Sequence, residues 1–319
     1  MTGPDVANED ADPGWSTYAS FLPPQRQGAV VEPERSWWGW RGHEVQLLRR
    51  PNADAAVRML VVHGAGAHAE ALWPVATQVD GLDLTAVDLP LYGRTRTRRR
   101  SRVRYQDWID LLVDLVEAEL RADADGRPLI LLGGSIGGLL AVEAAARSGR
   151  VAQVVATCLL DPQDPQARAR MTRFGRPGGV SMRLLPMVRG PLARLPVRIS
   201  WVAPLSRMGR DPGLGSLCAG DPRGGAARVP LGFMASYLSH EHAAARRIPV
   251  PVLLTHPEQD DWTPIGLSRR TLAQVPGPTE EVVLGGCGHF PLEEPGLQQL
   301  VERLAALVDE VAGGQREKD

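Results

Sequence analysis

Cysteine is scarce in this sequence. The chain has 319 residues but only three cysteines, Cys158, Cys218 and Cys287. An odd number of widely spaced cysteines predicts neither a disulfide framework nor a zinc-binding motif. We therefore expect no disulfide bond, no metal site and a reducing, cytoplasmic location.

The chain also lacks long hydrophobic runs and an excess of charge. None of its apolar stretches approaches the roughly 20 residues that a membrane-spanning helix needs. The opening stretch MTGPDVANEDADPG is acidic and polar, without the basic and apolar regions of a signal peptide. The formal net charge is −1, whereas a general nucleic-acid-binding protein needs a positive excess. We therefore expect no membrane span, no secretion signal and no nucleic-acid partner.

Strand-like patterns recur through most of the chain. Continuous apolar runs at 57–64, 128–135 and 250–260 are typical of strands that are buried on both faces. The other expected strands form a hairpin around Arg41–His43 and lie at 82–90, 151–161 and 280–288.

Helical patterns lie between these strands. One apolar stripe runs from Trp108 to Val116, and an alanine-rich helix is expected at 136–148. A third stripe, from Leu297 to Val311, is expected to end at Gly313–Gly314. Alternating strands and helices predict an α/β fold with a mostly parallel central sheet and helices on both faces. In such folds the ligand binds at the carboxyl ends of the strands.

Two segments interrupt the alternation. Residues 1–34 are rich in proline, aspartate, glycine and alanine, and we expect a partly disordered extension that is a candidate surface for homo-oligomer formation. Residues 162–247 show no clean strand and are rich in proline, glycine, arginine and methionine. So long an insertion predicts a mostly helical cap after the sixth strand. The core domain would then comprise residues 35–161 and 248–319.

Residues suited to nucleophilic catalysis follow the expected strands. The turn His63–Gly66, Ser135, Asp260 and His289 all fall at strand ends, in the order serine, acid, histidine. A serine hydroxyl needs a base to take its proton, and the base needs a carboxylate to orient it. We predict Ser135 as nucleophile, His289 as base and Asp260 as acid. Asp161, which ends the strand before the cap, is an alternative acid.

The backbone around the serine suits an oxyanion hole. The Ile136 amide follows the nucleophile at a helix N-terminus, and the Ala65 amide lies in the HGAG turn, so both are predicted oxyanion donors. The glycines of GGSIGG would allow a strained turn at Ser135. The alternative interpretation is a plain strand-to-helix turn in which Ser135 is a small polar spacer.

Five motifs together resemble the α/β-hydrolase superfamily, in particular its capped esterases, lipases and monoacylglycerol-lipase-like members. The resemblance covers about residues 35 to 312, and it implies the α/β-hydrolase fold with a serine nucleophile and no cofactor or metal. The serine at the nucleophile position disfavours the dehalogenase and epoxide-hydrolase branches, which need a carboxylate there. The motifs are HGAGAHAEALW, DLPLYGR, GGSIGG, EQDDWTP and GCGHFPLEEP.

The composition of the cap favours an apolar substrate. Methionine adapts to varied apolar ligands, so we expect a small-molecule substrate, a medium-sized apolar ester or lactone, cleaved through an acyl-enzyme. Carbon–carbon bond hydrolases, amidases and perhydrolases share this triad, and a non-catalytic ligand receptor shares the fold. The arginine run 94–104 either is solvated or contacts an anionic substrate. The predicted substrate-binding residues are Tyr92, Met182, Met187, Phe233 and Trp262.

Overall fold

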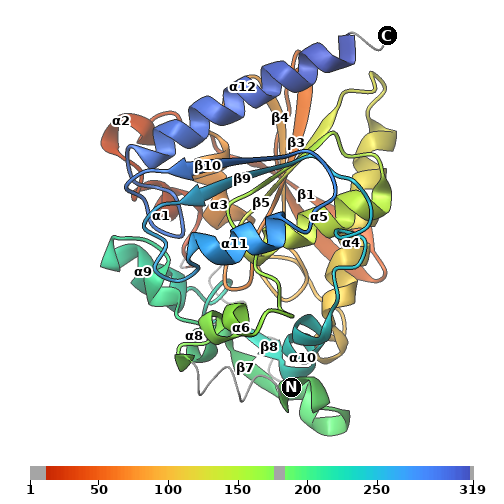
Figure 1. The fold of residues 1–319 in the computed structure, drawn as a ribbon, viewed down its shortest axis with the longest axis vertical. Coiled ribbons are helices and arrows are strands. Elements are labelled where there is room, and N and C mark those ends of the chain that lie inside the picture. The colour runs from red at the N-terminus through yellow and green to blue at the C-terminus, as the bar shows by residue number, and fades with distance from the viewer. Residues whose placement is uncertain (1–11, 176–183, 317–319) are drawn as a thin grey trace, which may run out of the picture.

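An eight-stranded sheet forms the centre of the molecule in the computed structural model, which describes residues 12–175 and 184–316 (Figure 1). The strand order is β1-β2-β4-β3-β5-β6-β9-β10; β2 runs antiparallel to both of its neighbours, and all other pairs are parallel. The predicted, mostly parallel sheet is confirmed. The strands are β1 (Glu34–Trp40), β2 (His43–Arg50), β3 (Val57–Val62), β4 (Leu82–Val87), β5 (Leu129–Gly133), β6 (Gln153–Ala156), β9 (Val252–Pro257) and β10 (Thr279–Leu284).

Helices cover both faces of this sheet, as predicted. In Figure 1 the long α12 lies on one side of β9 and β10, and α5 and α11 lie on the other. The helices outside the cap are α1 (Trp15–Ala19), α2 (Pro24–Gln27), α3 (Ala69–Ala76), η1 (Arg100–Arg102), α4 (Tyr105–Ala122), α5 (Ile136–Ser148), α11 (Ile265–Leu272) and α12 (Gly296–Arg316).

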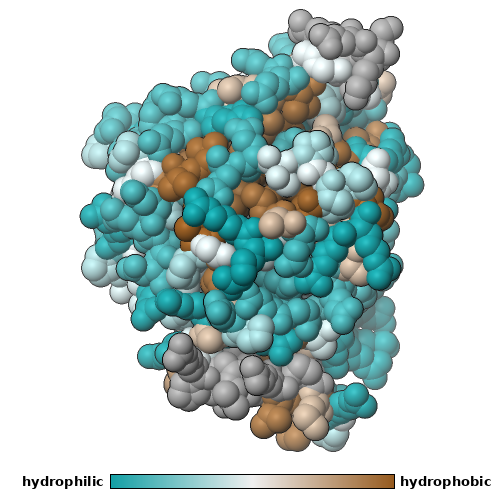
Figure 2. Space-filling model, in the orientation of Figure 1, coloured by the Kyte–Doolittle hydropathy of each residue, from teal (hydrophilic) through white to brown (hydrophobic). Residues whose placement is uncertain are grey.

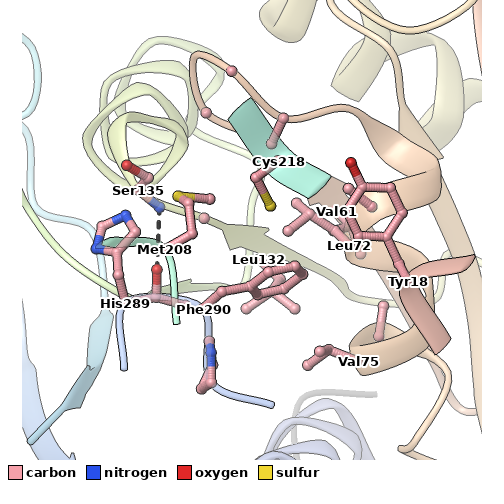
Figure 3. Close-up of a pocket in the computed structure, with 18 of the residues that line it drawn as sticks. Tyr18, Val61, Leu72, Val75, Leu132, Ser135, Met208, Cys218, His289 and Phe290 are labelled. Atoms are coloured by element: carbon pink, nitrogen blue, oxygen red, sulfur yellow. Dashed lines mark hydrogen bonds between the residues drawn. The ribbon is translucent and has the colours of Figure 1, made fainter. Parts of the chain in front are cut away.

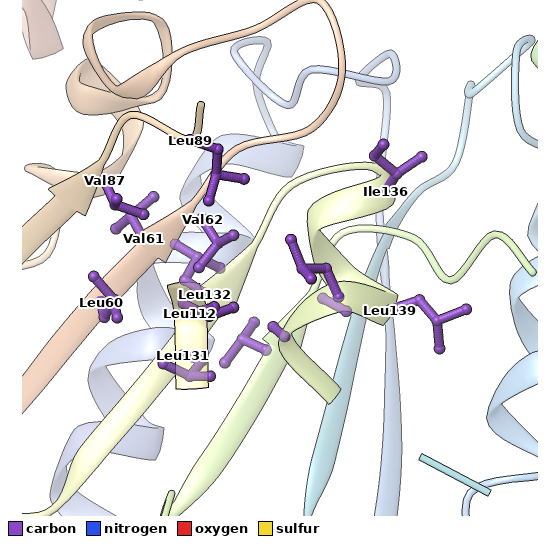
Figure 4. Close-up of a cluster of buried hydrophobic side chains, with 14 of the residues drawn as sticks. Leu60, Val61, Val62, Val87, Leu89, Leu112, Leu131, Leu132, Ile136 and Leu139 are labelled. Carbon is purple, nitrogen blue, oxygen red and sulfur yellow. The ribbon is translucent and has the colours of Figure 1, made fainter. Parts of the chain in front are cut away.

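The central strands form the core. Every residue of β3, β5 and β9 is buried, which explains why their sequences are continuous apolar runs rather than alternating ones. Figure 4 shows Val61 and Leu132 of the sheet among the side chains of Leu112 from α4 and Ile136 and Leu139 from α5. Each fully buried aliphatic side chain of this kind stabilises the fold by about 1.5–3 kcal/mol.

The predicted hairpin joins β1 to β2. Arg41 and Gly42 form a two-residue turn with φ angles of 45° and 82°, and Trp40 pairs with His43. Positive φ at both central positions defines the type I′ turn, whose twist matches that of the flanking strands. The hairpin prediction is therefore confirmed.

Two predicted boundaries were wrong. The last helix does not end at Gly313–Gly314 but continues to Arg316. Neither glycine has a positive φ, so neither forms a left-handed C-cap, and a glycine costs a helix only about 1 kcal/mol relative to alanine. The strand expected at 151–161 is confined to β6, and residues 157–161 form the connection that leaves the sheet.

The cap segment, residues 162–247, follows the sixth strand, as predicted, and its elements gather at one end of the molecule (Figure 1). It contains a two-stranded ribbon that was not expected, since three-residue strands bordered by proline are too short to give a strand pattern. The domain boundaries themselves stay a prediction. The elements of the cap segment are α6 (Pro165–Met171), η2 (Leu185–Met187), η3 (Gly190–Arg194), β7 (Pro196–Arg198), α8 (Ile199–Val202), η4 (Leu205–Arg207), α9 (Pro212–Gly220), β8 (Arg228–Pro230) and α10 (Leu231–Ser239).

A buried carboxylate joins the N-terminal segment, the cap segment and the core. Tyr18 in α1 is only 1% exposed, and its hydroxyl donates to Asp221 Oδ2 at 2.6 Å. The same oxygen lies 2.7 Å from His68 Nε2, just before α3. Burial raises the pKa of Asp221, but hydrogen bonds and charge from His68, with the Tyr18 hydrogen bond, bring it below its ordinary value. The described part of the N-terminal segment is thus attached to the body.

The close approach of α5 to its neighbouring strands depends on glycines, which have no side chain. Ser135 joins them with a φ of 54°, a conformation that non-glycine residues rarely adopt. A Cβ on Gly133 would lie 2.4 Å from the Gly137 carbonyl oxygen, and one on Gly138 would lie 2.3 Å from the Cys158 carbonyl oxygen. The helix therefore packs against its neighbouring strands at backbone distance, which is the role predicted for these glycines.

Two alanine substitutions at this close approach should differ sharply. A Cβ on Gly137 would lie 2.6 Å from the Val62 carbonyl oxygen, whereas the nearest atom to a Cβ on Gly134 is Leu72 Cδ1 at 3.5 Å. We expect Gly137→Ala to lower the free energy of unfolding by about 3 kcal/mol and Gly134→Ala to change it by less than about 1 kcal/mol. Urea unfolding followed by circular dichroism measures both. Equal losses would contradict the packing described.

Candidate active site

Three of the predicted residues lie at one edge of the sheet. Ser135 follows β5, Asp260 follows β9 and His289 follows β10. These strands are parallel, and β5 and β9 both pair with β6, so their carboxyl ends bring the three side chains into one region.

Asp260 and His289 form a buried pair. His289 Nδ1 lies 2.7 Å from Asp260 Oδ2, and Asp260 Oδ1 accepts hydrogen bonds from the amides of Trp262 at 2.9 Å and Thr263 at 2.8 Å. Burial raises the pKa of Asp260, but the charge of His289 and hydrogen bonds from His289 and Thr263 outweigh it and hold the pKa below its ordinary value. Asp260 is therefore ionised at neutral pH, and the Nδ1 proton of His289 points to it.

The other nitrogen of this histidine is available. His289 is buried, and its Nε2 forms no hydrogen bond with any residue that the structure describes. Ser135 lines the same pocket as His289 (Figure 3), where the Ser135 amide donates to Thr157 Oγ1 at 3.1 Å. The structure thus brings serine and histidine together without a hydrogen bond between them.

Two free backbone amides lie next to Ser135. Ile136 begins α5, and Ala65 lies in the loop after β3. Neither amide has a hydrogen-bond acceptor among the described residues. A Cβ on Gly64 would lie 2.9 Å from Ser135 Cβ, so this loop lies directly against the serine. The two predicted oxyanion donors therefore have no acceptor among the described residues and lie next to Ser135.

His63 holds the loop before Ala65. Its Nδ1 lies 2.7 Å from the Gly64 carbonyl oxygen, and its Nε2 accepts a hydrogen bond from the Leu89 amide at 2.9 Å. Burial lowers the pKa of His63 to about 3, so its ring stays neutral. With both nitrogens occupied, His63 has a structural role and is no base.

Two apolar pockets meet at Ser135 and Ala65. The first, between the N-terminal segment and α3, is shown in Figure 3; the second lies beneath the cap segment. An acyl compound bound at the serine would therefore have apolar walls on two sides. The first pocket is lined by Tyr18, Val61, Leu72, Val75, Met208 and Phe290 among others, and the second by Leu160, Met171, Ile199, Phe233, Tyr237 and Trp262 among others.

Only some of the predicted substrate-binding residues line these two pockets. Phe233 and Trp262 line the pocket beneath the cap segment. Tyr92 is buried against His63 and Trp108, with ring centroids 5.6 Å and 5.7 Å away, and lines neither pocket.

Of the two methionines predicted with them, one is exposed and the other lies outside the described residues. Met187 is 71% exposed on the cap surface and lines neither pocket, and Met182 lies outside the described residues.

Tyr18, Met208 and Phe290 line the first pocket but were not named among the substrate-binding residues. Tyr18 reaches it from the distant N-terminal segment, Met208 belongs to the methionine-rich cap segment, and Phe290 directly follows His289. The aromatic residues Trp15, Tyr18 and Phe21, which the sequence suggested could attach this segment to the body, were the available signal for Tyr18.

The alternative acid and the arginine run have other partners. Asp161 forms an ion pair with Arg246 and accepts the Gln163 amide at 2.8 Å. In the run 94–104, Arg96 pairs with Glu44 at 2.8 Å, and no residue of the run lines either pocket at Ser135.

The described ranges contain no group of three or more His, Cys, Asp and Glu side chains arranged to hold a metal ion. No helix within the same ranges is long and apolar enough to cross a membrane.

The fold is similar to several solved structures. A soluble variant of monoglyceride lipase from Saccharomyces cerevisiae superposes with a TM-score of 0.67 at 15% identity, covering 88% of this chain and 96% of that one. Monoacylglycerol lipase from Paleococcus ferrophilus gives 0.58 at 21% identity, covering 89% and 99%. A loop variant of haloalkane dehalogenase from Bradyrhizobium elkanii gives 0.63 at 15% identity, covering 90% and 100%. Identities this low show a shared fold, and the named activities of these proteins differ.

Sequence comparison identifies the family. A search among curated proteins found no significant match. The profile of the alpha/beta hydrolase family, however, matches residues 59–303, which is most of the chain and includes Ser135, Asp260 and His289. The chain therefore belongs to the alpha/beta hydrolase family.

Proposed function

We propose that this protein is a serine hydrolase that cleaves carboxylic esters through an acyl-enzyme. The proposal rests chiefly on the buried Asp260–His289 pair, whose Nε2 is free, beside Ser135 on a strained turn. The two apolar pockets on either side of Ser135 favour a medium-sized apolar ester or lactone. Two of the structurally similar proteins are named as lipases, which supports the same reaction class.

The proposed reaction begins when the Ser135 hydroxyl turns towards His289. Its oxygen attacks the ester carbonyl carbon while His289 Nε2 takes the proton. Asp260 stabilises the imidazolium through Nδ1. The amides of Ala65 and Ile136 donate to the developing oxyanion. His289 then protonates the leaving alcohol, and water releases the acyl group by the same route.

A non-catalytic ligand receptor is the second candidate. One observation favours it: His289 Nε2 has no hydrogen-bond partner among the described residues, so the Ser135 hydroxyl is not hydrogen-bonded to it. Catalytic hydrogen bonds are, however, often long or unformed until substrate binds. Binding of an ester without turnover would distinguish a receptor from an enzyme.

Removal of the proposed nucleophile should abolish ester hydrolysis. We expect Ser135→Ala to lower kcat/KM for p-nitrophenyl butyrate by about 1,000-fold or more, because the covalent route is lost. Ser148→Ala, at the other end of α5, is the matched control and should retain the wild-type rate. Hydrolysis by the Ser135 variant at the wild-type rate would refute the proposed role of this serine.

Substitution of the two candidate acids should have different effects on kcat in the same assay. We expect Asp260→Asn to lower kcat by about 1,000- to 10,000-fold, because a neutral amide neither holds the tautomer nor stabilises the imidazolium. Asp161→Asn removes an ion pair with Arg246 and should leave kcat within about threefold, because this carboxylate pairs with Arg246 and not with His289. The reverse pattern would assign the acid to Asp161.

A further inference from the structure

We propose that a groove in the cap segment binds the anionic group of an amphiphilic substrate or product, a carboxylate or phosphate, while its apolar part lies in the cap pocket. The cap pocket is the second pocket described above, beneath the cap segment. This inference rests on the proposed function, because it places the molecule beside Ser135.

Among the residues that the structure describes, the groove presents three arginines and no carboxylate. Arg170 at the end of α6, Arg173 and Arg207 of η4 are exposed along it. Within residues 12–175 and 184–316, none of the three forms an ion pair, and the side-chain hydrogen bond of Arg170 goes to the Asp261 carbonyl oxygen at 3.4 Å. Three uncompensated guanidinium groups around one concavity attract an anion. The other lining residues are Gln166, Ala169, Thr172, Gly175 and Pro204.

This basic groove and the cap pocket share their walls. Met171 lines the cap pocket, and its neighbour Thr172 lines the groove. Likewise, Ala203 lines the cap pocket and Pro204 lines the groove. The two wall segments are joined directly, since the Arg173 amide donates to the Val202 carbonyl oxygen at 2.7 Å. The basic groove therefore lies directly against the wall of the cap pocket.

A further hydrogen bond links this wall to the cap pocket. The Trp262 indole lines that pocket, and its Nε1 donates to the Arg170 carbonyl oxygen at 2.8 Å. Trp262 also follows closely on Asp260, whose carboxylate accepts its amide. The basic groove is thus connected through one residue to the loop that carries the proposed acid.

Positive charge is concentrated in this part of the chain. Residues 162–247 contain fourteen arginines but only four acidic residues, although the whole chain has a net charge of −1. Guanidinium groups match carboxylate and phosphate oxygens in a bidentate geometry. The cap segment thus combines an apolar pocket with a surface that selects against cations and favours anions.

A lipid bilayer is another source of anionic groups. Figure 2 shows hydrophobic side chains at the lower end of the molecule. In the cap segment, Leu184, Met187, Leu192 and Leu195 are exposed. Apolar and basic residues on one surface also suit binding to an anionic membrane. The concave shape of the basic groove and its shared wall with the cap pocket favour a single bound molecule over a membrane surface. The experiment below distinguishes these two sources of the anionic group.

Octanoate and 1-octanol, which share a chain length and differ in charge, are suitable probes. Their binding to the full chain is measured by isothermal titration calorimetry, and their inhibition of p-nitrophenyl butyrate hydrolysis is measured in parallel. The groove variant is Arg170→Gln/Arg173→Gln/Arg207→Gln. The matched control, Arg189→Gln/Arg194→Gln/Arg198→Gln, removes the same charge from exposed cap positions outside the groove. Circular dichroism melting checks that both variants fold.

We expect the wild type to bind octanoate at least about tenfold more tightly than 1-octanol, as charge-assisted hydrogen bonds would give. The groove variant should lose that preference while its affinity for 1-octanol is unchanged, and the control should stay within about twofold of the wild type. Calorimetry needs no turnover, so absent hydrolysis would count against the proposed function alone.

Three outcomes would overturn the inference. The wild type binds both probes equally; or the control variant loses octanoate affinity as much as the groove variant does; or the protein binds vesicles of phosphatidylcholine and phosphatidylglycerol but no free octanoate. The last result would assign the arginines to a membrane surface. If the groove variant does not fold, Arg173→Gln alone is tested in its place, and an unchanged affinity for octanoate would then refute the proposal.

Discussion

The close packing of α5 against β3, β5 and β6 is the constraint on which the rest of the site depends. Because Gly133, Gly137 and Gly138 carry no Cβ, the chain turns from strand to helix within two residues, and Ser135 takes a positive φ. Such strain costs about 1–3 kcal/mol and persists only where the surroundings hold it. The same turn directs the Ile136 amide and the helix N-terminus to the place where a substrate carbonyl would lie.

Buried polar groups hold the other parts of the site against this turn. Asp260 fixes one nitrogen of His289, and His63 holds the loop that carries Ala65. Asp221 accepts hydrogen bonds from Tyr18 and His68, so the N-terminal segment and the cap segment are attached to the core at the same buried carboxylate. The first apolar pocket, which Tyr18 helps to line, therefore exists because a distant segment is held in place.

The elements that the sequence predicted best are those with local signals. Continuous apolar runs identified the buried strands, and the glycines around Ser135 indicated a tight turn, because both features arise from neighbouring residues. The positions of the other predicted residues depend on tertiary packing. Met187 lies on the surface and Tyr92 in the core, although the sequence suggested pocket positions for both. The role of Tyr18 and the arginine groove depend on segments that only the fold brings together, and no periodicity predicts such contacts.

The central claim is that Ser135 is an activated nucleophile. Intact-mass spectrometry after incubation with a fluorophosphonate tests it most directly, because this reagent phosphonylates an activated serine whatever the natural substrate is. We predict a single adduct on the wild-type chain, mapped to Ser135 and absent from Ser135→Ala. An adduct on another residue, or no adduct on a folded protein that still binds apolar ligands, would contradict it.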